Sequence, residues 1–399
     1  MYKLTGKVQH YEWGGHEYIP ELLNEVNFEN LPYAEYWMGA HHSNPSVIEV
    51  GQELKPLDKF LEENSSLLGD KVKDRFGRLP YLFKVLDVKD MLSIQVHPSK
   101  AEAEKGFVRE NQKGIPLNAP NRNYKDDNHK PEVMIALSEF WLLHGFRERP
   151  DLKKILQETA VFNFLLPIFE TEGYYGLYKY VMELPQEQVD NILAPLLAGL
   201  EVDYKAGKLS RSEPGYWAAK IIFEEDKPLK DIDRGIFSIY FFNILHLHPG
   251  EGIFQGAGLP HAYLEGQNIE LMANSDNVLR GGLTPKHIDV PELLKHTLFE
   301  GINPVLLKAD AGSLETVYPC PVPDFIVSRI QLNAGNIYRG KAFSVEILLV
   351  SEGQADFTAG STKLTLQKGE SACMMANETY EIGTTGQATI FKAAVPGSD

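Results

Sequence analysis

The sequence has little cysteine, a deficit of basic residues and no long apolar run. With only Cys320 and Cys373, a disulfide scaffold is excluded, and a reducing cytoplasm is the expected compartment. The formal net charge of −16 argues against sequence-independent nucleic-acid binding, which relies on basic surface. No run approaches a membrane span, and Met1 to Trp13 lacks the basic and apolar regions of a signal peptide. We therefore expect a cytoplasmic protein without nucleic-acid or membrane partners.

Size and composition indicate a globular protein with more than one core. The 399 residues are 43% hydrophobic and 24% charged, enough for two or three packed cores. Alternating segments broken by Gly, Pro and Asn predict antiparallel strands up to about Phe146, including Tyr81 to Val88, Met91 to His97 and Val133 to Phe140. The same pattern resumes at Ile236 and continues to the end of the chain.

Helical spacing of apolar residues separates these two β-rich parts. The predicted helices are Pro150 to Thr159, Tyr174 to Met182, Gln186 to Ala206 and Glu213 to Phe223. Three of them begin near a proline, which is favoured in a first helical turn. The chain should therefore be mainly β, with a helical domain inserted between strands.

The β-α-β order predicts the domain boundaries. Residues 1–146 and 235–310 would form one barrel, interrupted by a helical domain at 147–234, and residues 311–399 would form a second barrel. Because His296 is the last histidine, the second barrel lacks an imidazole ligand and should be structural and free of metal.

A pair of metal-ligand candidates stands in Met91 to His97. If this segment is a strand, its side chains alternate between two faces, so Gln95 and His97 share the face opposite the apolar residues Leu92, Ile94 and Val96. Glu132 at the head of another apolar run and His261 in a Gly-rich loop are further candidates. Two nitrogens and two oxygens, collected from distant segments, suit zinc or another first-row divalent ion.

Each candidate taken singly has a simpler explanation. A lone Gln or His is more often a hydrogen-bonded residue than a ligand. His246 and His248 show the same two-residue spacing, and periodicity does not rank them below Gln95 and His97. The adjacent pair His41 and His42 is weaker, since neighbouring strand residues face apart.

Cationic residues stand close to these ligands in an otherwise acidic chain. Lys130 precedes Glu132, while Arg280 and Lys286 follow His261 in a glycine-punctuated segment. An acidic protein that binds an anion must place local cations against its own field, and these three are the candidates. Together with the ligand set, they indicate a metal-assisted enzyme acting on an anionic substrate.

Several strings closely resemble the type I phosphomannose isomerases. They are SIQVHP (93–98), NHKPE (128–132), LPHAYLEG (259–266) and IELMANSDNVLRGGLTPK (269–286), with YEWG (11–14) and YWMGAH (36–41) near the amino terminus. The resemblance implies a cupin-like jelly-roll catalytic domain, a helical domain and a second jelly roll. It also implies one Zn²⁺ per chain, held by Gln95, His97, Glu132 and His261, and so favours this set over His246 and His248.

The resemblance further implies interconversion of mannose 6-phosphate and fructose 6-phosphate through a cis-enediol. Charge then develops on O1 and O2, where a divalent ion and the permanently charged Arg280 would stabilise it. Glu270 is the first candidate for the base, with His129 and Lys130 as rivals. Lys130 and Lys286 are candidate phosphate partners, and Ser93 is a candidate hydroxyl donor.

Two readings from other classes stand beside the isomerase. A cupin oxygenase would use two His and one carboxylate on iron, and the additional Gln disfavours it. A sugar-binding protein without activity would not need Arg280 and Glu270 beside a metal. We expect the partner to be a phosphorylated hexose and the protein to be a monomer, with the helical insertion closing over the sugar.

Overall fold

The computed structural model describes residues 1–308 and 312–397. The chain is mainly β, and its strands form a ten-stranded and an eleven-stranded sheet. The first runs in the order β10-β9-β12-β6-β3-β2, with β7, β8, β11 and β13 paired beside this path. These strands span Lys7–Gln9 (β2), Glu35–Gly39 (β3), Tyr81–Val88 (β6), Gln95–Val96 (β7), Glu132–Ala136 (β8), Phe140–Phe146 (β9), Phe242–Leu247 (β10), Gly252–Gln255 (β11), His261–Ala273 (β12) and Leu279–Arg280 (β13).

The eleven-stranded sheet combines both ends of the chain. Strand β1 pairs with β19 on one side and with β4 on the other, so the amino-terminal segment extends the carboxy-terminal sheet. The strands are Tyr2–Thr5 (β1), Val47–Val50 (β4), Glu53–Pro56 (β5), Glu315–Tyr318 (β14), Ile326–Asn333 (β15), Ile337–Lys341 (β16), Glu346–Ala359 (β17), Thr362–Gln367 (β18), Ser371–Met374 (β19), Thr379–Gly383 (β20) and Gln387–Ala394 (β21).

The hydrogen bonding gives two sheets rather than two closed barrels. The pairing order of the larger sheet ends at β14 and at β5, and in neither sheet does the main path among the described residues return to its first strand. The prediction of closed barrels therefore needs correction, because β1, β4 and β5 cross from the predicted first domain into the second sheet. The predicted boundary between residues 310 and 311 lies outside the described residues.

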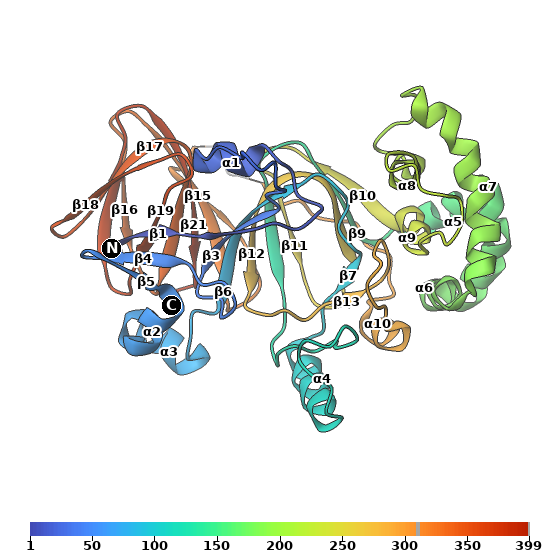
Figure 1. Ribbon diagram of the computed structural model, residues 1–399, viewed down its shortest axis with the longest axis horizontal. Helices are drawn as coiled ribbons and strands as arrows, with labels where there is room; N and C mark the ends of the chain where they lie inside the picture. The colour runs from blue at the N-terminus through green and yellow to red at the C-terminus, as the bar shows by residue number, and fades with distance from the viewer. Residues whose placement is uncertain (309–311, 398–399) are drawn as a thin grey trace.

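Most helices gather at one end of the molecule, and the others lie beside the two sheets. The predicted insertion contains Arg149–Glu158 (α5), Leu166–Glu183 (α6), Gln186–Lys205 (α7) and Pro214–Phe223 (α8), which confirm the four predicted helices within a few residues, except that α6 begins eight residues earlier. Gly235–Phe241 (α9) follows directly after the insertion. The others are Tyr18–Leu23 (α1), Leu57–Glu63 (α2), Asp70–Phe76 (α3), Lys100–Gln112 (α4) and Val290–His296 (α10). Figure 1 shows the ten-stranded sheet between the larger sheet and the helices of the insertion.

Three predicted elements were wrong in detail. The predicted strand Val133 to Phe140 covers most of β8, a bend at residues 137–139 and the first residue of β9. The β pattern does not resume at Ile236, because Gly235–Phe241 is a helix whose seven residues are all buried. A segment that is apolar on every side shows no period that separates a buried helix from a strand. In the segment from Met91 to His97, only Gln95–Val96 is a strand. Ile94 instead exchanges backbone hydrogen bonds with Gly281 and Gly282, at 2.8 and 3.0 Å.

Alternation along the strands separates an apolar face from a polar one. The face toward the eleven-stranded sheet carries apolar residues that share one core with Val327, Ile347 and Leu349 of that sheet, namely Phe83, Val85, Val133, Ile135, Ile269 and Leu271. The intervening positions on the same strands include Lys84, Glu132 and Glu270, all less than 7% exposed. Charged side chains are thus buried on the face away from that core.

In the described part of the chain, no helix has the length and hydropathy of a membrane crossing.

Candidate metal and anion site

Three buried side chains converge where β7, β8 and β12 meet. One ligand atom from each of His97, Glu132 and His261 lies within 4.8 Å of the others, and no side chain of the three exceeds 4% exposure. The Glu132 carboxylate oxygens lie 3.4 Å from His97 Nε2 and 3.2 Å from His261 Nε2. The folded chain therefore brings together three of the four predicted metal ligands.

Backbone carbonyls orient both imidazoles. His97 Nδ1 donates to the Asn277 carbonyl at 2.9 Å, and His261 Nδ1 donates to the Leu259 carbonyl at 2.8 Å. Since a carbonyl only accepts, the proton of each neutral ring sits on Nδ1 and the Nε2 lone pair faces Glu132. This is the outer hydrogen bonding that usually orients metal-bound histidines.

Electrostatics favour the metal-binding protonation states. Burial lowers the pKa of His97 to about 4, an effect that the Glu132 carboxylate partly offsets. Burial tends to raise the pKa of Glu132, but Lys130 and His97 hold it well below its usual range. His97 Nε2 is buried and has no hydrogen-bond partner in the part of the chain that the structure describes. A neutral imidazole with an unpartnered lone pair, beside a carboxylate, fits a divalent cation.

Gln95 and Arg280 continue the site across neighbouring strands. Gln95 lies opposite His261 in the β7–β12 pairing and opposite Arg280 in the β7–β13 pairing. Directly paired residues of antiparallel strands project from the same face. Arg280, Gln95 and His261 therefore form a row, with neighbouring strands about 4.8 Å apart. This register supports Gln95 as the fourth ligand and sets Arg280 beside the metal cluster.

A group of cations lies next to this row. Burial lowers the pKa of Arg280, and burial together with the charges of Arg280 and Lys125 lowers the pKa of Lys286. Within residues 1–308 and 312–397, no carboxylate lies within 4.0 Å of the charged groups of Arg280, Lys286 or Lys125. Among the described residues, Arg280 is therefore not one half of a salt bridge. Mutually repelling cations without carboxylate partners suit a bound anion.

The remaining predicted residues fall in different places. Lys130 Nζ lies 2.8 Å from Glu132 Oε1, so it contacts the metal cluster as expected. Ser93 precedes Ile94, whose backbone bonds the loop after Arg280. His129 is not brought to the cluster, because its Nε2 lies 3.1 Å from both carboxylate oxygens of the buried Asp324, which needs a partner. His129 is thus the partner of Asp324 and not of Glu132.

Glu270 belongs to a buried polar network. Lys84 Nζ donates to Glu270 Oε2 at 3.0 Å, and the Tyr263 hydroxyl donates to Oε1 at 2.9 Å. Lys84 also lies 3.2 Å from Glu35, and although burial lowers its pKa, the two carboxylates raise it above its usual value. Burial raises the pKa of Glu270, while Lys84 opposes the shift. A carboxylate tuned in this way suits proton transfer.

Sequence reasoning missed three residues of this region. Lys84 interrupts the apolar strand Tyr81–Val88, and a charge in the middle of such a strand was the signal available. Lys125 gave no signal. His144 lies opposite His261 in the β9–β12 pairing and is 4% exposed, and no described residue forms a hydrogen bond with its Nδ1. Burial, with the nearby His261, lowers its pKa to about 3.

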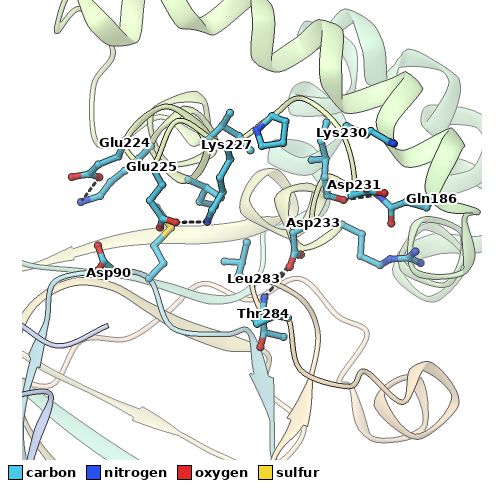
Figure 2. A pocket seen from close by; sticks show the side chains of 18 of the residues that line it. Asp90, Gln186, Glu224, Glu225, Lys227, Lys230, Asp231, Asp233, Leu283 and Thr284 are labelled. Atoms are coloured by element: carbon cyan, nitrogen blue, oxygen red, sulfur yellow. Dashed lines mark hydrogen bonds and ion pairs between the residues drawn. The ribbon is translucent and has the colours of Figure 1, made fainter. Parts of the chain in front are cut away.

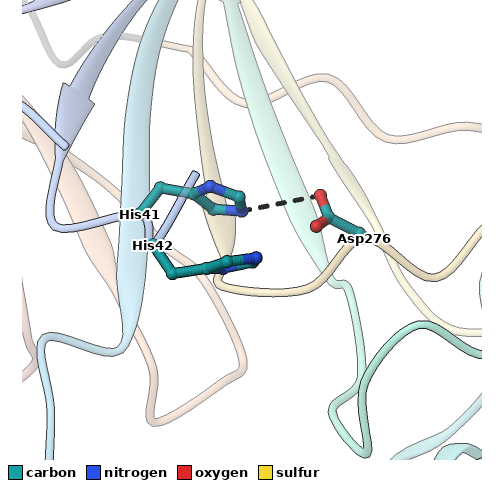
Figure 3. A group of neighbouring side chains, drawn as sticks. All are labelled: His41, His42 and Asp276. Atoms are coloured by element: carbon teal, nitrogen blue, oxygen red, sulfur yellow. Dashed lines mark ion pairs between the residues drawn. The ribbon is translucent and has the colours of Figure 1, made fainter. Parts of the chain in front are cut away.

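Two other clusters resemble metal sites but are more exposed. Figure 3 shows His41 and His42 on one side of a turn, facing Asp276, with His41 Nε2 3.5 Å from the carboxylate. The expectation that these histidines face apart was wrong, because β3 ends at Gly39 and the pair lies in a turn, with ring centroids 4.6 Å apart. The other cluster joins His246 and His248 to Glu139. Neither cluster is fully buried, unlike His97, Glu132 and His261.

A cavity of about 640 Å³ lies between the helical insertion and the loop after Arg280. Figure 2 shows Asp233 facing Thr284 across its floor. Asp233 accepts hydrogen bonds from the backbone N–H groups of Leu283 and Thr284, each at 2.8 Å. None of the predicted metal ligands lines this cavity. At its wall, Asp233 connects the helical insertion to the loop that follows Arg280.

Known proteins resemble the chain over nearly its whole length. Residues 1–149 match the family phosphomannose isomerase type I, catalytic domain. The mannose-6-phosphate isomerase of Escherichia coli (strain K12) is 39% identical over 386 residues, 95% of each chain, and that of Homo sapiens is 33% identical over 420 residues, 96% of each. A zinc-bound mannose 6-phosphate isomerase structure matches with a TM-score of 0.88 at 37% identity, covering 99% of both chains. The chain therefore belongs to the type I phosphomannose isomerase family.

Proposed function

We propose that this protein is a zinc-dependent aldose-ketose isomerase that interconverts mannose 6-phosphate and fructose 6-phosphate through a cis-enediol. One observation carries the proposal. Two imidazole Nε2 atoms with backbone-fixed tautomers converge on the Glu132 carboxylate, beside cations that have no carboxylate within 4.0 Å among the described residues. The full-length relatives named mannose-6-phosphate isomerase support the choice of substrate.

The proposed metal site holds one Zn²⁺ per chain. Its ligands are the two nitrogens and two oxygens of Gln95, His97, Glu132 and His261, a set without thiolate that suits zinc. The zinc-bound relative supports the identity of the metal. Zinc in this position would polarise the sugar oxygens O1 and O2 as a Lewis acid. Lys130, at 2.8 Å from Glu132, keeps that ligand ionised.

The surrounding residues supply the proton transfer. Glu270 is the proposed base that takes the C2 proton and returns one to C1, and its hydrogen bonds from Lys84 and Tyr263 hold the carboxylate in one orientation. Arg280, in register with Gln95, would stabilise negative charge on the enediolate with a donor fork that stays protonated. Glu270 is buried and Arg280 is half-buried, so solvent screens their interactions with the substrate less than it would at the surface.

The phosphate would bind at the outer cations. Lys286 and Lys125 are exposed, lie close enough to each other to lower the pKa of Lys286, and have no carboxylate within 4.0 Å among the described residues. A dianionic phosphate would relieve this repulsion. Ser93 is the proposed hydroxyl donor, since its segment runs beside the loop that links Arg280 to Lys286.

Architecture, compartment and assembly belong to the same proposal. We propose that the two sheets are the cores of cupin-like jelly rolls, with residues 1–146 and 235–310 around the helical domain at 147–234 and residues 311–399 as the carboxy-terminal unit. Strands β1, β4 and β5 of the first segment complete the sheet of that carboxy-terminal unit, which we propose holds no metal. Both cysteines are free, which supports the cytoplasm. A monomer is consistent with a site whose ligands all come from one chain.

Metal analysis with a coupled fructose 6-phosphate assay tests the function. The purified protein should contain about one tightly bound zinc ion per chain, as single catalytic zinc sites do. Chelation should abolish the isomerase activity, and zinc should restore it. Full activity in a rigorously metal-free preparation would disprove the metal-dependent mechanism, whereas iron in place of zinc with oxygen consumption would favour an oxygenase.

A further inference from the structure

The histidine pair that the isomerase site leaves unused lies on the edge strand of the ten-stranded sheet. His246 and His248 occur two residues apart in or just after β10, so their side chains share a face. The β9–β10 pairing sets His246 opposite Trp141, and the same register sets His248 opposite Glu139. Three metal-ligating side chains therefore meet across two adjacent strands.

The ligand atoms of this cluster are already close. Glu139 Oε2 lies 2.5 Å from His246 Nε2 and 3.0 Å from His248 Nδ1. His246 Nε2 is buried, and apart from its close approach to Glu139 it has no hydrogen-bond partner among residues 1–308 and 312–397. In a tetrahedral zinc site with bonds of about 2.1 Å, ligand atoms are about 3.4 Å apart. The Glu139 side chain is 56% exposed and therefore has room to rotate when an ion binds.

Aromatic packing fixes the inner histidine before any ion arrives. The His246 ring stacks on Trp141 with centroids 4.1 Å apart and an interplanar angle of 4°. Trp141 in turn packs against the fully buried Trp217 of α8, at 5.8 Å. His246 therefore loses little side-chain entropy on binding a metal, which is how preorganised sites gain affinity.

The cluster is separate from the catalytic site. Trp141 and Leu143 of β9 belong to the core shared with the helical insertion, whereas Phe140 and Leu142 face the opposite way. Glu139 and His246 follow the first alternation, while His144, which pairs with His261, follows the second. The two ligand clusters thus lie on opposite faces of the sheet.

We propose that Glu139, His246 and His248 form a second metal site, for a first-row divalent ion such as Ni²⁺, Cu²⁺ or Zn²⁺. Two imidazole nitrogens and one carboxylate oxygen suit these ions, and solvent water completes the coordination because His248 is 63% exposed. A bound ion would link the edge strand β10 to β9, where the chain returns from the helical insertion to the sheet.

Metal counting on the zinc-loaded protein tests the second site. The wild type, His248→Asn and Glu139→Gln are dialysed against Ni²⁺ and analysed by mass spectrometry. The wild type should retain about one Ni²⁺ more per chain than His248→Asn, and Glu139→Gln should bind roughly tenfold more weakly or worse. Any Ni²⁺ that replaces zinc at the catalytic site adds the same amount to every variant. The difference in Ni²⁺ content between the proteins therefore reports the second site alone.

Two further measurements keep the result specific. His42→Asn should bind Ni²⁺ like the wild type, which separates this site from the cluster of His41, His42 and Asp276. Cu²⁺ should quench tryptophan fluorescence in the wild type and less in Trp141→Phe, because Trp141 stacks on a ligand. Equal Ni²⁺ content in the wild type and His248→Asn would overturn the proposal. Isomerase activity should be unchanged in His248→Asn, because His248 lies outside the catalytic cluster.

Discussion

Two backbone carbonyls decide which imidazole nitrogens are available to a metal. Because Asn277 and Leu259 hold the Nδ1 protons of His97 and His261, both Nε2 lone pairs face Glu132. His97→Ala and His261→Ala should each lose zinc and isomerase activity together, measured by metal analysis and coupled assay. His246→Ala is the matched control and should keep the tightly bound zinc and the activity. If His246→Ala lost activity while His97→Ala kept it, the catalytic metal would lie at His246, on the opposite face of the sheet.

Arg280 is a half-buried cation without a carboxylate within 4.0 Å among the described residues. Its row with Gln95 and His261 sets it beside the proposed metal ligands, where the proposed enediolate would form. Arg280→Ala should keep its zinc while kcat falls by roughly a hundredfold or more, as losing an oxyanion donor does. Arg280→Lys should recover only part, since an ammonium group lacks the planar fork. If the Ala variant kept kcat and only melted earlier, Arg280 would be structural.

Glu270 differs from Glu132 in its partners, and the role of base is proposed for it on that ground. Burial raises its pKa, and Lys84 and Tyr263 hold both of its oxygens. Glu270→Gln should retain zinc and lower kcat by about a hundredfold or more, the usual cost of removing a general base. Tyr263→Phe removes one hydrogen bond and should have a smaller effect. A Gln variant with normal kcat would transfer the role of base to another group.

At the scale of elements, Asp233 joins the helical insertion to the loop after Arg280. Its carboxylate accepts from Leu283 and Thr284, so closure of the insertion would carry the loop toward the sugar. Adding fructose 6-phosphate should slow hydrogen exchange in α5–α9 and in residues 281–288. Asp233→Ala should weaken the coupled protection while leaving zinc bound. Unchanged exchange in the wild type at saturating substrate would identify the insertion as a scaffold.

For the whole molecule, buried neutral histidines make stability depend on pH. The pKa of His144 falls from an ordinary 6.5 to about 3, chiefly through burial, so on acidification the unfolded chain binds a proton before the folded one. The contribution of neutral His144 to the free energy of unfolding is fully present above pH 6.5. It is lost as pH falls toward 3, by at most about 1.4 kcal/mol per pH unit. Denaturant unfolding between pH 7.5 and 4, with chelator present throughout, measures the loss.

The matched variant separates His144 from the carboxylates that titrate in the same range. His144→Asn removes the imidazole, whereas the acidic groups remain. Its stability should therefore fall less steeply between pH 6.5 and 4 than that of the wild type. Parallel curves for the two proteins would show that His144 keeps the same pKa in the folded and unfolded states.

Local pattern was sufficient for much of this protein. Four helices of the insertion were predicted because apolar residues repeat at the helical period and prolines mark three of the starts, and β6 was predicted within its bounds by alternation. The ligand motifs around Gln95, His97, Glu132 and His261 were recognisable from the family resemblance. These features depend on neighbours in the chain, so the sequence by itself determined them.

Tertiary structure decided which of those residues meet. Lys84 and Glu270 are 186 residues apart in the chain, and only the β6–β12 pairing sets them opposite each other. The same pairing between distant strands brings Gln95 beside both His261 and Arg280, and a buried Asp324 draws His129 away. Periodicity reports which face a side chain takes but not which strand lies next to it. Long-range register, set by burial of the common apolar face, supplied that information.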